Sequence, residues 1–397
     1  MKYDFDTPVN RYNTASIKFD RMDALYPEYN KEFIPLFVAD MDFRTAQPII
    51  DAMHRVADFG MWGYTSNSAE PKYNDAVICW FNRHHQLEIS PEEIIFSNGT
   101  MEAMRTIINT FSNIGDGVIL CRPVYGHFSQ CIEDECYRKV TDAHLIFDDK
   151  KQNWELDFDE IEKKCSDPQN RIMIISNPHN PVGRVWSKEE LSKVAEICHK
   201  YNILLVSDEV HCDIVRNGIK HNTIYNSTNL RENIIMLTAI NKTFNMAGLS
   251  CSNVIIKDKF LRERFISAFG EHNPSPFAVY GLIAAYNNGD EWLSQANEYM
   301  DNNIDWLIGF LRENMPKVKT VRPEGTYCLW LDFSEYGLSG DEIHDIIYNK
   351  ARVFLQDGIV HDPIYGQQCQ RVCIPCARCV LKEAFERIKT EFDKITK

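Results

Sequence analysis

Through the middle of the chain, short apolar runs rich in β-branched residues alternate with longer amphipathic segments. The runs have the length of strands and few polar positions, which is typical of strands buried on both faces of a sheet. The predicted strands are 94–96, 118–121, 172–176, 203–207, 234–237 and 253–256. The intervening helices include 102–111 and 187–200, the second with Ser187 as its N-cap and Glu190 three residues later. This alternation predicts an α/β fold with a mainly parallel sheet and helices on both faces.

The pattern changes after about residue 285. We expect a long helix at 291–313, strands at 317–321 and 328–333, and a final helix at 380–395. The first 45 or so residues are irregular and rich in aromatic side chains, and we expect them to pack against this last part or across a subunit interface. The predicted division is therefore an N-terminal arm with part of the small domain (1–45), a large domain (46–285) and a small α+β C-terminal domain (286–397).

Composition narrows the class of protein. The 397 residues include 57 acidic and 43 basic ones, for a net charge of −14, and no stretch is dense in Lys or Arg. We therefore expect no nucleic-acid partner. No apolar run approaches the roughly 20 residues that span a bilayer, and the N-terminus lacks the basic start and apolar core of a secretory signal. The thirteen cysteines are accordingly expected to be reduced thiols in the cytoplasm, and their odd number excludes pairing them all within one chain.

Four polar clusters follow predicted strands, at the edge where open parallel sheets bind ligands. They are 97–101, 177–183, 207–211 and 241–249. Taken singly, each has a structural explanation: a capped helix start, a rigid Asn-Pro turn, a salt-bridged strand end and a solvent-exposed lysine. The acids and histidine of 207–211 would also suit a metal. Lys242 has a further possibility, because desolvation beside a buried strand lowers its pKa and favours Schiff-base chemistry.

Taken together, the order of these clusters resembles the fold-type-I pyridoxal-phosphate enzymes. That family needs a phosphate cradle, an acid at the pyridine nitrogen, a partner for the phenolic oxygen and a lysine. The resemblance implies a large domain with a mainly parallel seven-stranded sheet and a smaller α+β C-terminal domain. It also implies pyridoxal 5'-phosphate as the cofactor.

A narrower resemblance covers about residues 11–381. Segments 38–43, 63–65, 122–125, 177–185, 207–211 and 242–249 are similar to the MalY/PatB branch of cystathionine β-lyase-like carbon–sulfur lyases. The runs Ala39-Asp40-Met41-Asp42-Phe43 and Asn-Pro-His-Asn-Pro-Val-Gly-Arg from Asn177 are specific to that branch. The implied reaction is β-elimination, which converts L-cystathionine and other cysteine S-conjugates to pyruvate, ammonia and a thiol.

The resemblance also implies roles for individual residues. Lys242 would carry the cofactor and move the Cα proton, Asp208 would keep the pyridine nitrogen protonated, and Tyr125 would stack on the ring. The remaining cofactor-binding residues would be Gly99, Thr100, Met101, Asn180, His211, Asn241 and Tyr64. The substrate would be held by Arg371, which would bind its α-carboxylate, together with Asp40, Tyr64 and Asn180. Because Tyr64 would reach the phosphate of a neighbouring subunit, the family implies a homodimer with shared active sites.

The chain departs from the family at several positions. Asn241 replaces the serine usual before the lysine. The segment before Arg371 is shortened and has lost its usual glycines, Cys373 stands where asparagine is common, and Ala377 where proline is common.

The spacing of Cys369, Cys373, Cys376 and Cys379 could indicate a metal or iron–sulfur site. The expected path of strand, turn and helix spreads these thiols over different faces, so we predict no metal.

Three alternatives to the lyase remain open at this stage. The same lysine would serve an aminotransferase. Members of the branch can also act as regulators by binding a transcription factor. Finally, the altered neighbourhood of Arg371 could indicate specialised or impaired catalysis.

Overall fold

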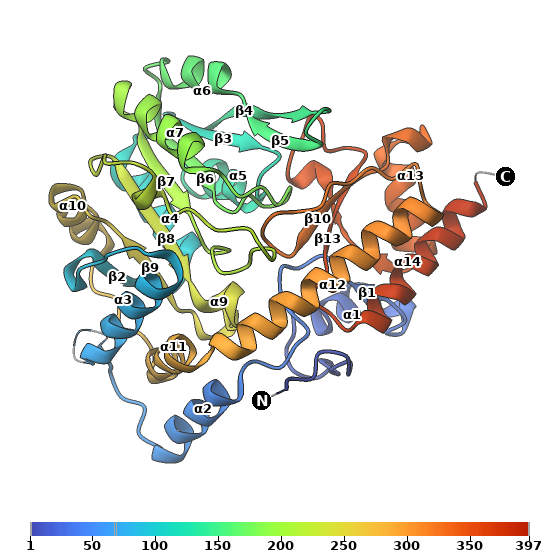
Figure 1. The fold of residues 1–397 in the computed structure, drawn as a ribbon, viewed down its shortest axis with the longest axis horizontal. Coiled ribbons are helices and arrows are strands. Elements are labelled where there is room, and N and C mark those ends of the chain that lie inside the picture. The colour runs from blue at the N-terminus through green and yellow to red at the C-terminus, as the bar shows by residue number, and fades with distance from the viewer. Residues whose placement is uncertain (1, 67, 69, 396–397) are drawn as a thin grey trace.

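Within residues 2–66, 68 and 70–395, which the computed structural model describes, eight strands form one large sheet (Figure 1). In spatial order they are β2 (Ile94–Ser97), β9 (Ser252–Ile255), β8 (Ile234–Ala239), β7 (Leu204–Asp208), β6 (Asn170–Ser176), β3 (Gly117–Arg122), β4 (Lys139–Asp148) and β5 (Asn153–Leu156). The five strands from β8 to β4 run parallel to one another. The predicted α/β fold with a mainly parallel sheet is confirmed.

The sheet has two strands more than the six predicted from apolar runs, and one more than the seven that the family resemblance implies. The second half of β4 pairs antiparallel with β5, from Leu145 opposite Leu156 to Asp148 opposite Asn153. Most of these positions are at least partly exposed, and the turn between the two strands contains neither glycine nor proline. The hairpin therefore lacks both the apolar run and the turn residues by which a strand is predicted from sequence.

Alternate residues of the central strands face two different cores. In β3, Val118 and Leu120 belong to one core, while Ile119 and Cys121 belong to the other. This double burial is why the strands are continuous apolar runs. The helices of this part are α2 (Gln47–Phe59), α3 (Pro71–His85), α4 (Thr100–Phe111), α5 (His127–Gln130), α6 (Phe158–Cys165), α7 (Lys188–Lys200), α8 (Ile224–Ser227), α9 (Ile240–Thr243), α10 (Lys259–Phe269) and α11 (Pro276–Asn288).

The C-terminal part has its own small antiparallel sheet. Its strands, in spatial order, are β10 (Cys328–Asp332), β13 (Cys369–Cys373) and β12 (Gln356–Asp357). Figure 1 shows the long α12 (Asp290–Asn314) running from α11 into this part, beside α14 (Arg378–Asp393), with α13 (Gly340–His344) nearby. The N-terminal segment, with α1 (Asp20–Leu25), joins it through β1 (Ile34–Pro35), which pairs in parallel with β11 (Val353–Phe354). None of the described helices is long and apolar enough to cross a membrane.

The predicted strand at 317–321 is wrong. The segment makes a single bridge, between Lys319 and Asp332. Pro316 and Pro323 flank it, and a proline has no N–H to donate to a ladder. The hydroxyl of Thr320 instead donates to the backbone oxygen of Trp330 at 2.9 Å.

Candidate active site

Four of the candidate residues lie at one edge of the large sheet, where its parallel strands end. Asp208 is the last residue of β7, and Lys242 lies in α9 directly after β8. Asn180 and Tyr125 lie in the loops that follow β6 and β3. Because β8, β7, β6 and β3 are successive neighbours, their ends bring these side chains to the same place.

Lys242 is half-buried, and its amine is held by backbone. Its Nζ donates to the backbone oxygen of Ala39 at 2.7 Å. Burial lowers the pKa of Lys242. A larger share of the amine is therefore neutral than in an exposed lysine, and only the neutral form is a nucleophile or base.

Asp208 is a buried carboxyl that accepts few hydrogen bonds from the protein. Its Oδ1 accepts from the backbone N–H of Val210 at 3.3 Å. Burial raises the pKa of Asp208 to about 7, although this hydrogen bond and the charge of Lys242 act in the opposite direction. A cationic ring nitrogen placed here would keep the carboxylate ionised, so Asp208 fits the acid that a pyridine cofactor requires.

His211 and Tyr125 place two aromatic rings near the charged groups of the site. His211 is buried, and its Nδ1 has no hydrogen-bond partner among the described residues. Burial lowers its pKa well below the usual value, with the charges of Lys242 and Arg371 acting in the same direction, so the imidazole is neutral. Burial raises the pKa of Tyr125, which is therefore a neutral phenol.

The N-terminus of α4 forms the candidate phosphate cradle. Gly99 precedes the helix, and Thr100 and Met101 are its first two residues, whose N–H groups have no acceptor within a helix. A Cβ on Gly99 would meet nothing within 4 Å, so the space beside it is open. Backbone N–H groups at a helix start favour an anion. The Oδ1 of Asn241, beside the lysine, is buried without a partner among the described residues. Together with Asp208 and Lys242, this cradle fits pyridoxal phosphate.

Arg371 approaches the same place from β13 of the small sheet. It is 2% exposed, its Nη2 donates to the backbone oxygen of Phe37 at 2.6 Å, and its Nη1 lies 3.4 Å from Asn180 Oδ1. Its Nε has no partner among the described residues. A buried guanidinium with a free donor suits a carboxylate ligand.

The other two candidate substrate residues are placed differently. The carboxylate of Asp40 is already paired with Arg11, at 2.7 Å. Tyr64 lies between α2 and α3 with a fully exposed side chain, so it contacts none of the other candidate residues within one chain.

Sequence analysis missed the residues that hold the segment around Asp40. Asn245, three residues after the lysine, accepts from the N–H of Met41 at 3.1 Å and donates to the oxygens of Met41 and Phe43 at 2.9 Å. The hydroxyl of Tyr327 donates to Ala39 O at 2.9 Å, the same oxygen that Lys242 uses. The only signal for Asn245 was its place within the run from Lys242 to Leu249, and nothing local pointed to Tyr327.

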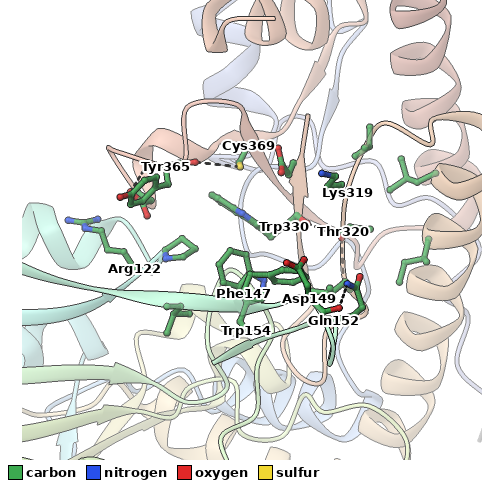
Figure 2. A pocket seen from close by; sticks show the side chains of 18 of the residues that line it. Arg122, Phe147, Asp149, Gln152, Trp154, Lys319, Thr320, Trp330, Tyr365 and Cys369 are labelled. Atoms are coloured by element: carbon green, nitrogen blue, oxygen red, sulfur yellow. Dashed lines mark hydrogen bonds between the residues drawn. The ribbon is translucent and has the colours of Figure 1, made fainter. Parts of the chain in front are cut away.

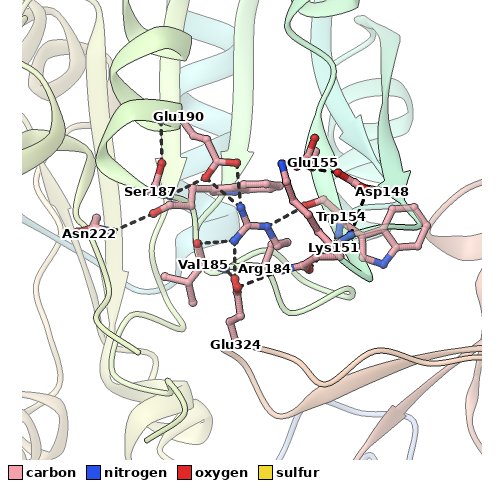
Figure 3. Close-up of polar contacts among 12 residues, drawn as sticks. Asp148, Lys151, Trp154, Glu155, Arg184, Val185, Ser187, Glu190, Asn222 and Glu324 are labelled. Carbon is pink, nitrogen blue, oxygen red and sulfur yellow. Dashed lines mark hydrogen bonds and ion pairs between the residues drawn. The ribbon is translucent and has the colours of Figure 1, made fainter. Parts of the chain in front are cut away.

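Arg184 follows Asn180 in the same loop, and Figure 3 shows the polar contacts that its side chain makes. The guanidinium pairs with Glu190 of the large part at 2.9 Å and with Glu324 of the C-terminal part at 2.5 Å. Gly183 beside it has φ +77°, and a Cβ there would lie 2.2 Å from Pro323. The branch-specific run thus requires glycine at 183 and uses the arginine to join the two parts of the molecule.

The four clustered cysteines do not converge on one point. Cys373 lies against a fifth cysteine, Cys328, with 3.6 Å between the sulfur atoms, whereas Cys379 is exposed. Among the described residues, the one group with metal-ligand geometry is His85, Cys212 and Asp213. In that group, a hydrogen bond of 2.7 Å already joins Nε2 of His85 to Oδ1 of Asp213.

A cavity of about 720 Å³ lies beside the site, between the β4–β5 hairpin and the C-terminal part. Figure 2 shows Phe147 and Trp154 of the hairpin lining it together with Trp330 and Tyr365. Trp330 is the cross-strand partner of Arg371, so the cavity adjoins the arginine's strand pair.

Known proteins resemble the chain over nearly its whole length. The family model for aminotransferase class I and II matches residues 31–388. Cystathionine beta-lyase PatB from Bacillus subtilis (strain 168) is 35% identical over 389 residues, covering 97% of this chain and 98% of that protein. Cystalysin from Treponema denticola, which contains a pyridoxal 5'-phosphate cofactor, superposes with a TM-score of 0.93 at 32% identity over 99% of this chain and 100% of its own. The PLP-bound C–S lyase from Staphylococcus hominis has a TM-score of 0.89 at 28% identity over 98% of each chain.

Proposed function

The chain belongs to the aminotransferase class I and II family, and we propose that it acts there as a pyridoxal-phosphate-dependent carbon–sulfur β-lyase. Its substrates are L-cystathionine and related S-conjugates of L-cysteine, which it cleaves to pyruvate, ammonia and a thiol. One observation carries the proposal: Lys242, Asp208 and Arg371 share a buried site in a chain 35% identical to a cystathionine β-lyase.

The chain's own residues divide the work between cofactor and substrate. Pyridoxal phosphate, when bound, supplies an aldehyde that condenses with amines and a ring that accepts negative charge from the substrate's Cα. The N-terminus of α4, from Gly99 to Met101, would hold the phosphate. Asp208 would hold a proton on the ring nitrogen, and Tyr125 would cover one ring face. Asn180, His211 and Asn241 would complete the polar lining.

Substrate orientation falls to Arg371 and proton transfer to Lys242. The free Nε of Arg371 supports a role in binding the α-carboxylate. With the carboxylate fixed, Nζ of Lys242 would accept the Cα proton, because burial keeps part of the amine neutral. The Cβ–S bond then breaks and the thiolate leaves. Asp40, through its pair with Arg11, would position the backbone that holds Lys242.

An exposed apolar surface supports the assignment of Tyr64 to a partner subunit. Phe59 and Met61 are each 71% exposed, and Trp62 and Tyr64 follow with exposures of 61% and 103%. They adjoin a groove formed by α2 and α11. Clustered exposed aromatic residues favour a protein interface. We propose a homodimer in which Tyr64 reaches the partner's phosphate cradle, and a mass in solution of two chains would support it.

Two further proposals concern location and domain limits. All thirteen cysteines are free thiols, which supports a cytoplasmic location. The pairing of β1 with β11 supports assigning residues 1–45 in part to the small domain, with 46–285 as the large domain and 286–397 as the rest of the small one.

The test is a pyruvate assay with L-cystathionine and no added keto acid. The lyase releases pyruvate and a free thiol in equal amounts, and the Lys242→Ala variant serves as the control for background elimination. An aminotransferase would need a keto acid for every turnover, so a strict keto-acid requirement rejects the lyase. Binding of the cofactor without turnover of any cysteine conjugate would favour impaired catalysis.

A further inference from the structure

Two cysteines face each other across the strand pair that carries Arg371. Cys328 of β10 and Cys373 of β13 are directly opposite in the antiparallel register. Their sulfur atoms are 3.6 Å apart, and both residues are fully buried. Side chains of residues two apart on a strand share a face, so both thiols lie on the same face of the sheet as Arg371.

The backbone at this pair has the geometry that a disulfide needs. The N–H of Cys373 donates to Leu36 O at 2.8 Å, outside the strand pair. The N–H of Cys328 donates to the hydroxyl of Thr326 at 3.1 Å. The two cysteines are therefore a non-hydrogen-bonded pair, in which opposite Cα atoms lie about 4.5 Å apart. Disulfides span Cα separations of about 4.4–6.8 Å, so the bond can form by side-chain rotation with the strands in place.

The surroundings favour one thiolate and one thiol. Burial acts to raise the pKa of the Cys373 thiol, but the hydrogen bond from Cys328 and three nearby cations outweigh it and lower the pKa to about 6. The cations are Arg371, Lys18 and Lys242. Hydrogen bonding with Cys373 raises the pKa of Cys328 well above the usual range. A thiolate beside a protonated thiol is the arrangement in which oxidation leads to a disulfide.

We propose that Cys328 and Cys373 are an oxidisable thiol pair whose reversible disulfide sets the affinity of Arg371 for the substrate carboxylate. The effect on substrate affinity rests on the proposed function, in which Arg371 binds the substrate's α-carboxylate. Arg371 Nη2 and Cys373 Sγ lie 2.6 and 3.8 Å from the same backbone oxygen, that of Phe37, so the charge of the sulfur is close to the guanidinium.

Formation of the disulfide removes two electrons from the two thiols, and a peroxide such as hydrogen peroxide can accept them. The Cys373 thiolate attacks one peroxide oxygen and breaks the O–O bond, which gives a sulfenic acid and a hydroxide that takes up a proton. The sulfur of Cys328 then attacks the Cys373 sulfur, and the S–O bond breaks as water leaves with the Cys328 proton. The two thiols lose two electrons in total, and one peroxide becomes two waters. A dithiol reverses the reaction by exchange.

The consequence for binding follows from charge. In the reduced protein the Cys373 thiolate competes with a ligand carboxylate for Arg371. The disulfide is neutral, so oxidation removes the competing anion and strengthens carboxylate binding by about fivefold, as expected for one partly screened charge contact.

The experiment uses the cofactor-loaded enzyme and L-alanine, an amino acid without a leaving group. After treatment with hydrogen peroxide or dithiothreitol, free thiols are alkylated and peptides are analysed by mass spectrometry. The Kd for L-alanine is measured from the cofactor's absorbance. We expect a link between the peptides holding Cys328 and Cys373, and a Kd about fivefold lower that dithiothreitol restores.

Matched variants separate this pair from general oxidation. Cys328→Ala should form no link and show no peroxide-dependent change in Kd. Cys379→Ser removes an exposed thiol and should behave as the parent enzyme. The proposal is overturned if exposed Cys79 is oxidised while the pair stays reduced, or if the link forms and the Kd for L-alanine stays the same or rises. None of these readouts depends on lyase turnover, so failure of the proposed function would be seen separately, as absence of pyruvate from the reduced enzyme.

Discussion

The candidate site has two halves that are built in opposite ways. The cofactor edge consists of Lys242, Asp208, Asn180 and Tyr125, each of which lies at the end of its own strand of the large sheet or within four residues after it. The carboxylate pocket surrounds Arg371, whose neighbours come from three distant parts of the chain. They are Phe37 near the N-terminus, Asn180 in the large part and Cys328 across the small sheet. The first half is a property of local motifs, and the second is a property of long-range packing.

The two halves also differ in charge. At the cofactor edge, burial is the largest influence on both Asp208 and Lys242 and moves each towards its neutral form, although the charges of their neighbours partly oppose it. In the carboxylate pocket, the hydrogen bond from Cys328 and the nearby positive charges together outweigh burial at Cys373 and lower its pKa to about 6. At the cofactor edge, Asp208 therefore becomes fully ionised only when a cationic ligand binds. In the carboxylate pocket, Arg371 and the Cys373 thiolate are charged without a ligand.

Removing the lysine breaks the cofactor edge with the largest expected effect. Lys242→Ala should lower kcat for pyruvate release from L-cystathionine by about 10⁴-fold or more, because it removes the group that moves the Cα proton. Added methylamine should restore part of the rate by taking the place of the amine. Full activity in the unrescued variant would show that another group moves this proton.

The pH dependence of stability sharpens the charge comparison. In cofactor-free protein the pKa of Asp208 is raised to about 7 from an unfolded value of about 3.9. Its contribution to stability is therefore present below about pH 4 and is lost as the pH rises through 7, by about 4 kcal/mol in total. Urea unfolding at pH 5 and pH 8 should show about 2.6 kcal/mol of this decline, and Asp208→Asn should lack it. Equal pH dependence in the two proteins would mean that Asp208 is not desolvated.

Breaking the carboxylate pocket should have a smaller effect on rate and leave the cofactor in place. Arg371→Lys keeps the charge but loses the planar fork, so kcat/KM for cysteine conjugates should fall by about 100-fold, mainly through KM. The visible spectrum of the bound cofactor is the internal control. Loss of that spectrum would place Arg371 at the cofactor rather than at the substrate.

Sequence alone predicted six of the eight strands of the large sheet and the polar residues that follow them. Strand burial on two faces leaves a continuous apolar run, and the residue that follows such a run has a fixed position at the sheet edge. This is why the pattern of apolar runs and polar clusters was enough to place Asp208 and Lys242 at that edge, whereas their proposed roles came from the family resemblance. The same reasoning failed where strands are polar or interrupted, as in the β4–β5 hairpin and at 317–321.

Tertiary structure alone decided the partners across the chain. Sequence analysis predicted that Cys373 would not converge with Cys369, Cys376 and Cys379, but it could not name another partner, and the register of β10 against β13 sets Cys373 opposite Cys328. In the same way, Tyr327 and Lys242 share the oxygen of Ala39 although they are far apart in sequence. Local patterns fix which face a side chain takes, whereas strand pairing fixes what it meets there. The cofactor edge could therefore be read from motifs, and the chemistry beside Arg371 could not.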